Sequence, residues 1–184
     1  MTKLLVTIVG ADRPGIVHLV SAALFARGCV ISELAQTTLH GQFAGLFSVE
    51  APDGLLPLAL TDALSEGLKG SGLSSWVTPG EDGPGLQTVE TEPYVISITG
   101  PDSPGLIPDL TEGIAALGAN ILNLRSLSLT GGDGPAPVVL VLEVTLPATV
   151  ARQKLSETLN RCAESLGLEI SLQHRDIFEA IHRI

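Results

Sequence analysis

Two patterns of apolar and polar positions, one typical of strands and one typical of helices, alternate along the chain. The same order of patterns occurs twice. Nearly continuous apolar runs, rich in β-branched residues, predict buried strands at residues 4–9 and 94–99. Apolar residues that return every three or four positions predict helices with one buried face, as Ile16, Val20 and Leu24 do after the first strand. Each half of the chain is therefore predicted to combine strands and helices around a core of its own.

The remaining elements complete the order strand–helix–strand–strand–helix–strand in each half. That βαββαβ order is typical of a ferredoxin-like unit, in which an antiparallel sheet carries its helices on one face, and the fold class is α+β. The further strands are predicted at residues 30–39, 43–51, 73–78, 120–129, 138–146 and 168–173, and the further helices by the apolar stripes of Leu60, Leu64 and Leu68 and of Leu155, Leu159, Cys162 and Leu166.

A short turn precedes the first helix of each half, and its two copies lie 90 residues apart. The turns are Asp12-Arg13-Pro14-Gly15 and Asp102-Ser103-Pro104-Gly105. A proline at this place is typical of the first helical turn, where backbone N–H groups have no partner within the helix. Such a helix start can hold an anion or a carboxylate. The two turns are therefore the first candidates for a binding site.

A repeat of this length is one small domain rather than a solenoid unit, so two domains are predicted. We expect domain 1 at residues 1–80, a Gly- and Pro-containing linker at 81–91, and domain 2 at 92–184. Domain 2 differs by a longer hairpin loop at residues 131–135 and by a short C-terminal helix. That helix, at residues 176–184, places Ile177, Phe178 and Ile181 on one side and has no counterpart in domain 1.

Charge and cysteine content narrow the possible functions. The net charge is −10, from 20 acidic and 10 basic residues, and no basic stripe exists, so direct nucleic-acid binding is not expected. Cys29 and Cys162 show no paired spacing and are expected to be buried thiols in a reducing compartment. No secretory leader or membrane-spanning apolar run is visible, so a cytoplasmic location is expected.

No motif of catalysis is visible in the sequence. There is no nucleophile elbow, phosphate loop or dinucleotide fingerprint after a strand, so we expect no enzyme activity and no cofactor. The four histidines, His18, His40, His174 and His182, show no ligand spacing with cysteine or carboxylate, so no metal is expected.

The repeated strand, the Asp-x-Pro-Gly turn, the helix ending in Gly and the following Asn120-Ile121 resemble the ACT domain. Two such copies resemble the tandem ACT proteins of the glycine cleavage system transcriptional repressor group. The resemblance implies a free amino acid, such as glycine or serine, held where two domains meet. It assigns the ligand to the turn and to the start of the second strand, at Asp12, Arg13, Gly15, Asp102, Ser103, Gly105 and Asn120.

The second copy is the better candidate, because Val30 stands in the first copy where Asn120 stands in the second. Simpler roles remain open for the same residues. Asp12 and Ser103 could cap their helices, and Gly15 and Gly105 could only permit close packing. Arg13 could hold a ligand carboxylate or a neighbouring acidic side chain.

The resemblance also implies control of glycine cleavage genes through a protein partner, a transcription activator, rather than through DNA. Two other functions remain open, a stand-alone sensor that regulates a metabolic enzyme and a scaffold that only oligomerises. Because each predicted sheet leaves edge strands, a homodimer is expected.

Overall fold

The computed structural model describes residues 1–80, 89–128 and 137–182 and divides the chain into two compact units. Unit 1 is Met1–Leu86 and unit 2 is Gln87–Ile184. Most of the predicted linker, and the loop predicted at residues 131–135, lie outside the described residues. Each unit is described by itself.

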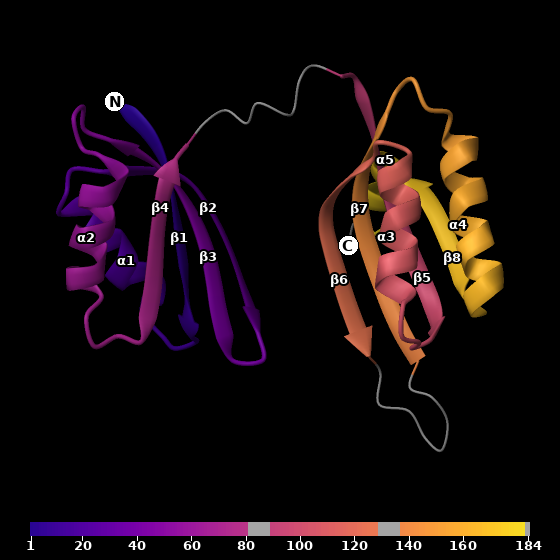
Figure 1. Ribbon diagram of the computed structural model, residues 1–184, viewed down its shortest axis with the longest axis horizontal. Helices are drawn as coiled ribbons and strands as arrows, with labels where there is room; N and C mark the ends of the chain where they lie inside the picture. The colour runs from indigo at the N-terminus through magenta and orange to yellow at the C-terminus, as the bar shows by residue number, and fades with distance from the viewer. Residues whose placement is uncertain (81–88, 129–136, 183–184) are drawn as a thin grey trace. The chain divides into compact units, whose positions relative to one another are not determined.

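Unit 1 is a four-stranded antiparallel sheet with two helices on one face (Figure 1). The strand order is β2-β3-β1-β4, so the first and last strands of the unit are neighbours. The βαββαβ prediction is confirmed. The elements in chain order are β1 (Thr2–Ala11), α1 (Ile16–Phe25), β2 (Val30–Leu39), β3 (Gln42–Ala51), α2 (Pro57–Gly67) and β4 (Leu73–Pro79).

Unit 2 repeats this architecture with the strand order β6-β7-β5-β8. Its helices α3 and α4 cover one face of the sheet (Figure 1), and an additional helix follows the last strand. The α+β class with two ferredoxin-like units is thereby confirmed. The elements are β5 (Thr91–Pro101), α3 (Leu106–Ala116), β6 (Asn120–Ser128), β7 (Pro137–Pro147), α4 (Arg152–Leu166), β8 (Glu169–His174) and α5 (Arg175–His182).

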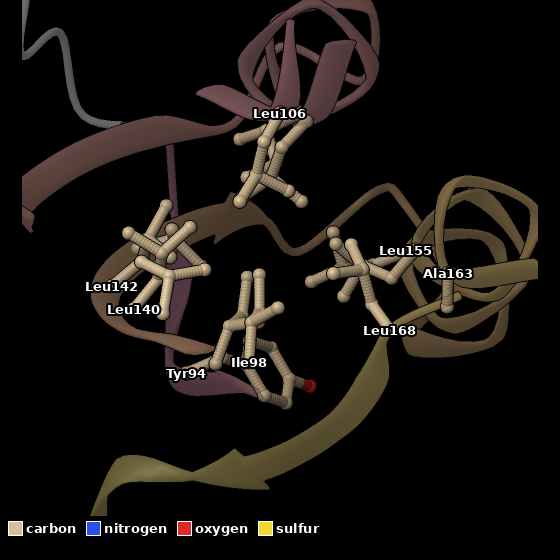
Figure 2. Close-up of a cluster of buried hydrophobic side chains, with 14 of the residues drawn as sticks. Tyr94, Ile98, Leu106, Leu140, Leu142, Leu155, Ala163 and Leu168 are labelled. Carbon is tan, nitrogen blue, oxygen red and sulfur yellow. The ribbon is translucent and has the colours of Figure 1, made fainter. Parts of the chain in front are cut away.

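The core of each unit lies between its sheet and its two helices. In β7, alternate residues are buried along the whole strand, as expected when one face packs on helices. Figure 2 shows the result in unit 2, where side chains from β5, β7 and α3 meet those from α4 and that of Leu168, which comes just before β8. The labelled core residues are Tyr94, Ile98, Leu106, Leu140, Leu142, Leu155, Ala163 and Leu168.

A two-residue turn joins β2 and β3 in unit 1. His40 and Gly41 have φ angles of 48° and 72°, and this left-handed pair gives the twist that antiparallel strands require. The Asp12 N–H donates to the Gly41 carbonyl at 2.8 Å, which holds the end of β1 against the hairpin.

Helices α1 and α3 begin two residues later than the sequence predicts. Gly15 and Gly105 are the N-cap residues, with φ angles of 92° and 95°, so Pro14 and Pro104 precede the helix instead of occupying its first turn. A left-handed φ is readily adopted only by glycine, and this explains why glycine ends both turns.

The C-terminal helix α5 lies on the face of the second sheet opposite α3 and α4. Val95 points away from the core, because its neighbours Tyr94 and Ile96 on β5 point into it. Together with Val141 it lines a cavity of about 240 Å³ against the Phe178 side chain of α5. Val95 is only 3% exposed, so α5 covers part of a sheet face that the ferredoxin-like pattern alone leaves open.

Candidate functional site

Each Asp-x-Pro-Gly turn is fixed to the end of the second strand of its unit. The Thr38 hydroxyl donates to the Asp12 carboxylate at 3.4 Å, and the Ser128 hydroxyl donates to the Asp102 carboxylate at the same distance. Neither α1 nor α3 has a side-chain cap, so the suggestion that Asp12 or Ser103 caps its helix is wrong. The aspartate side chains contact the end of the second strand instead.

The two helix starts differ in the backbone donors they leave free. In unit 2 the Leu106 N–H donates to the Ser103 carbonyl, and Pro108 has no N–H, so Ile107 carries the remaining free amide of the first turn. In unit 1 the first such bond within the described part of the chain is made by Leu19, to the Gly15 carbonyl. The amides before Leu19 therefore face solvent or a ligand.

Unit 2 has a cavity of about 160 Å³ at its turn. Asp102, Ser103 and Gly105 line it, so the structure brings these three predicted residues together. The Ser103 hydroxyl oxygen is buried and has no hydrogen-bond partner among the described residues. The Ser103 hydroxyl is therefore available for a hydrogen bond to a polar group that enters this cavity.

Sequence analysis missed the residues that complete this cavity, chiefly Ile107, Ser126 and Val138. Ser126 pairs with Leu140, which is buried, so it is a polar residue on the helix-covered face of the sheet. A polar residue at a position of β6 where alternation predicts an apolar one is the signal that could have identified Ser126.

Asn120 lies away from this turn. It begins β6, whereas Ser128, the partner of Asp102, ends it, and eight residues of strand separate them by about 26 Å. Asn120 lines a different groove of about 440 Å³ along α3, and Pro108 is the residue that borders both spaces. A single free amino acid in unit 2 cannot reach both Asn120 and the Asp102 turn.

The turn of unit 1 has different side chains around it. Asp12, Arg13 and Gly15 are exposed, and Phe43 occupies the register position that Val138 has in unit 2. The Phe43 ring lies over Gly45, within 2.8–2.9 Å of where a Cβ would stand. Gly45 occupies the register position of Leu140, so the Phe43 ring lies where unit 2 has the Leu140 side chain.

The cysteines lack the character of nucleophiles. Burial raises the pKa of the Cys29 thiol, and burial together with the Asp109 charge raises the pKa of Cys162. Cys29 is buried as expected, whereas Cys162 is only half-buried. Across the described residues, no group of three or more His, Cys, Asp or Glu side chains is placed to hold a metal ion.

The chain therefore consists of two tandem ferredoxin-like units, and each unit has an Asp-x-Pro-Gly turn before its first helix. A family model for the ACT domain matches residues 2–66 and 92–173. The chain belongs to the ACT domain family, whose domains bind small amino acids and serve regulatory roles. No helix in the described ranges is long and apolar enough to span a membrane.

Curated relatives match one half of the chain. A UPF0237 protein of Methanopyrus kandleri is 30% identical over 90 residues, which are 49% of this chain and 96% of that protein. A UPF0237 protein of Clostridium perfringens is 32% identical over 90 residues, or 49% and 97% of the two chains.

Two solved structures match nearly the whole chain. A protein of Galdieria sulphuraria, described as unknown, has a TM-score of 0.81 at 26% identity and covers 94% of this chain and 98% of its own. A protein provisionally named a glycine cleavage system transcriptional repressor has a TM-score of 0.70 at 17% identity, covering 94% and 96%. The second likeness is one of fold.

Proposed function

We propose that this protein is an amino-acid-responsive regulator whose ligand, a small amino acid such as glycine or serine, binds at the turn cavity of unit 2. The orphan Ser103 hydroxyl carries the proposal, because it lies in a cavity that also contains a carboxylate and borders a helix start. The volume of about 160 Å³ lies below the roughly 300–1,000 Å³ of drug-sized sites and favours a small ligand.

The polar groups around this cavity match the two ends of an amino acid. The Asp102 carboxylate accepts hydrogen bonds from the ligand ammonium while it still holds the Ser128 hydroxyl. The Ser103 hydroxyl and the free Ile107 amide donate to the ligand carboxylate at the positive end of α3. Asn120 has no part in this arrangement.

We further propose that the protein regulates glycine cleavage genes by contacting a transcription activator, that it does not bind DNA directly and that it is not an enzyme. The provisionally named repressor of similar fold supports the gene assignment. The net charge of −10 supports action through a protein, since a polyanion would repel this chain.

One observation favours a second function, a sensor that regulates a metabolic enzyme. The UPF0237 relatives match one half of this chain over nearly their full length, so a single unit of this type exists as a protein of its own. Such units can serve many systems, and the tandem arrangement does not by itself indicate gene control.

Calorimetric titration of glycine and serine into the full chain and its variants tests the ligand site. Ser103→Ala should weaken binding by about 1–3 kcal/mol, because the ligand carboxylate loses a donor. Without ligand, Ser103→Ala should unfold at the same urea concentration as the parent or a higher one, since an unpaired hydroxyl is removed. Val138→Phe should abolish binding, because Leu140 keeps the new ring from the position that Phe43 has over Gly45 and leaves it to fill the cavity.

Two matched variants locate the site if this assignment fails. Arg13→Ala changes the residue that stands in unit 1 where Ser103 stands in unit 2, and it should leave binding unchanged. Asn120→Val should also leave it unchanged. Weaker binding in Asn120→Val with normal binding in Ser103→Ala would place the ligand in the groove along α3. An absence of heat with all free amino acids would refute ligand binding.

A further inference from the structure

The uncovered face of the first sheet corresponds, position by position, to the face that α5 covers in unit 2. Leu5 and Leu46 stand in unit 1 at the register positions of Val95 and Val141. Leu46 is 45% exposed, whereas its counterpart Val141 is half-buried. Leu5 is half-buried, whereas its counterpart Val95 is 3% exposed. Within residues 1–80 no helix of unit 1 lies on this side of the sheet, so unit 1 does not itself cover the apolar side chains that α5 protects in unit 2.

One row across the middle of this face contains two large exposed apolar side chains, Leu46 and Trp76. Strand pairing places Leu46 between Ala35 and Thr7, and Thr7 next to Trp76, which is 53% exposed. Contiguous apolar surface of this kind typically marks a contact with another molecule. We name the open side of the sheet of unit 1, centred on this row, the β-face.

We propose that the β-face is the contact surface of a homodimer in which the first sheets of two copies pack face to face. The row Ala35–Leu46–Thr7–Trp76 is self-complementary under a two-fold axis parallel to the strands. That axis places the large Trp76 over the small Ala35 of the other copy, and Leu46 over Thr7. Packed sheets lie about 10 Å apart, a distance that large and small side chains fill together.

The neighbouring rows have the same property. Leu5 comes to lie over Ser48, and Val9 over Ala44, so an apolar side chain again meets a small one. Glu33, in the row of Leu5, comes to lie over Thr78 rather than over a second Glu33. The axis therefore brings no two acidic groups of these rows together, which matters for two chains that each carry a net charge of −10.

The geometry favours a second copy over a different partner. An isologous contact uses one patch twice and closes after two copies, and a face complementary to itself suits that symmetry. Four strands about 4.8 Å apart, paired over seven residues, give a face of about 440 Å² per copy. Two such faces approach the lower limit of specific interfaces, so the dimer is expected to depend on concentration and to strengthen as salt screens the acidic charge.

The single tryptophan of the chain reports on this face directly. Light scattering across the micromolar range should give a mass that rises from 19.1 kDa towards twice that value. Trp76 emission should shift to shorter wavelength over the same range as the indole leaves water. This test does not depend on the amino-acid ligand and can succeed or fail independently of it.

A pair of lysine variants makes the test specific. Leu46→Lys should raise the dissociation constant roughly tenfold or more, since an unpaired ammonium would be buried at the centre of the contact. Leu58→Lys is the control, because Leu58 is an exposed leucine of α2 outside the β-face and should leave the dimer intact. Circular dichroism checks that both variants fold.

Three outcomes would overturn the proposal. A dimer whose Trp76 emission does not respond to concentration would use another surface, such as a sheet edge. A monomer with water-exposed Trp76 would leave the face without an occupant of this kind. A monomer with protected Trp76 at every concentration would mean that the same chain supplies the cover.

Discussion

Unit 1 and unit 2 share strand order, register and turn, and they differ in the side chains placed on that common backbone. Unit 1 has Arg13 in the turn and Phe43 in β3, where unit 2 has Ser103 and Val138, which line one cavity. On the sheet face away from the core, residues 1–80 supply no helix, whereas unit 2 carries α5. One unit thus has the features of a ligand site and the other those of a contact surface, so a duplicated fold can divide two tasks between its copies.

The comparison assumes that each unit has an independent core. Shortening a fully buried side chain in one core tests this assumption and should change stability more than the other substitutions. Phe47→Ala should destabilise unit 1 by about 3–5 kcal/mol, and Leu142→Ala should destabilise unit 2 by about 2–5 kcal/mol, since both side chains are fully buried. Urea unfolding is followed by Trp76 fluorescence for unit 1 and by circular dichroism for the whole chain.

Leu142→Ala should leave the fluorescence transition in place while the circular dichroism acquires an earlier step. Phe47→Ala should move the fluorescence transition to lower urea. If both variants shift the tryptophan signal equally, the two cores unfold as one, and the comparison of separate units is wrong.

A pair of equivalent glycines gives a smaller and more discriminating effect. A Cβ at Gly10 would lie 2.6 Å from the Gly72 carbonyl oxygen, which is backbone, whereas a Cβ at Gly100 would lie 2.7 Å from the end of the Leu168 side chain. Gly10→Ala should therefore destabilise its unit by about 1–3 kcal/mol, because backbone must move. Gly100→Ala should have a smaller effect because Leu168 can rotate.

Hydrogen exchange resolves the two glycine variants by unit. Protection should fall in the strands of unit 1 for Gly10→Ala, and much less in unit 2 for Gly100→Ala. Equal losses would indicate that the two sheets have the same tolerance at this position.

The smallest expected effect is a loss of stability of unit 2 at alkaline pH. Burial, then the hydrogen bond from its hydroxyl to Glu92, raise the pKa of Tyr94 above the ordinary value of about 10. The neutral phenol is therefore favoured in the folded unit. Its stabilising contribution is fully present below pH of about 10 and is lost as the pH rises through the raised pKa.

Unit 1 has Leu4 in the position of Tyr94, so its stability should not follow this titration. Tyr94 is the only tyrosine, and phenolate absorbance therefore reports unit 2 alone. Tyr94→Phe should abolish the alkaline loss of stability in unit 2. A parallel loss in unit 1, detected by Trp76, would contradict the assignment.

The order and extent of the elements could be predicted because alternation and the 90-residue spacing support each other. The strand predicted at residues 30–39 agrees with β2, and the helix ends at Gly28 and Gly118 follow α1 and α3 closely. Local patterning is a strong signal where one face is buried and the other is not.

The site was harder to predict, because it depends on distances across the sheet. Asn120 and Asp102 belong to the same sequence motif, so the sequence suggests that they lie close together. In the structure Asn120 begins β6, whereas Asp102 lies beside Ser128 at the other end of that strand. The apolar side chains along one side of α5 predict that this side is buried, but they do not indicate which face of the sheet it covers. Ser103 looked like a helix cap, but the left-handed Gly105 takes that position instead.

The position of β1 between β3 and β4 has a consequence during synthesis. The nascent chain can pair β1 with β3 early, but the other edge of β1 must wait for residues Leu73–Pro79. Between Ala11, the last residue of β1, and Pro79 the ribosome adds 68 residues, which takes roughly 3–14 s at about 5–20 residues per second. Throughout this interval, an unpaired strand edge is available to any extended chain nearby, including another copy on the same messenger. The ribosome-bound state of unit 1 is therefore where strand-swapped pairing between copies can begin, before unit 2 has been made.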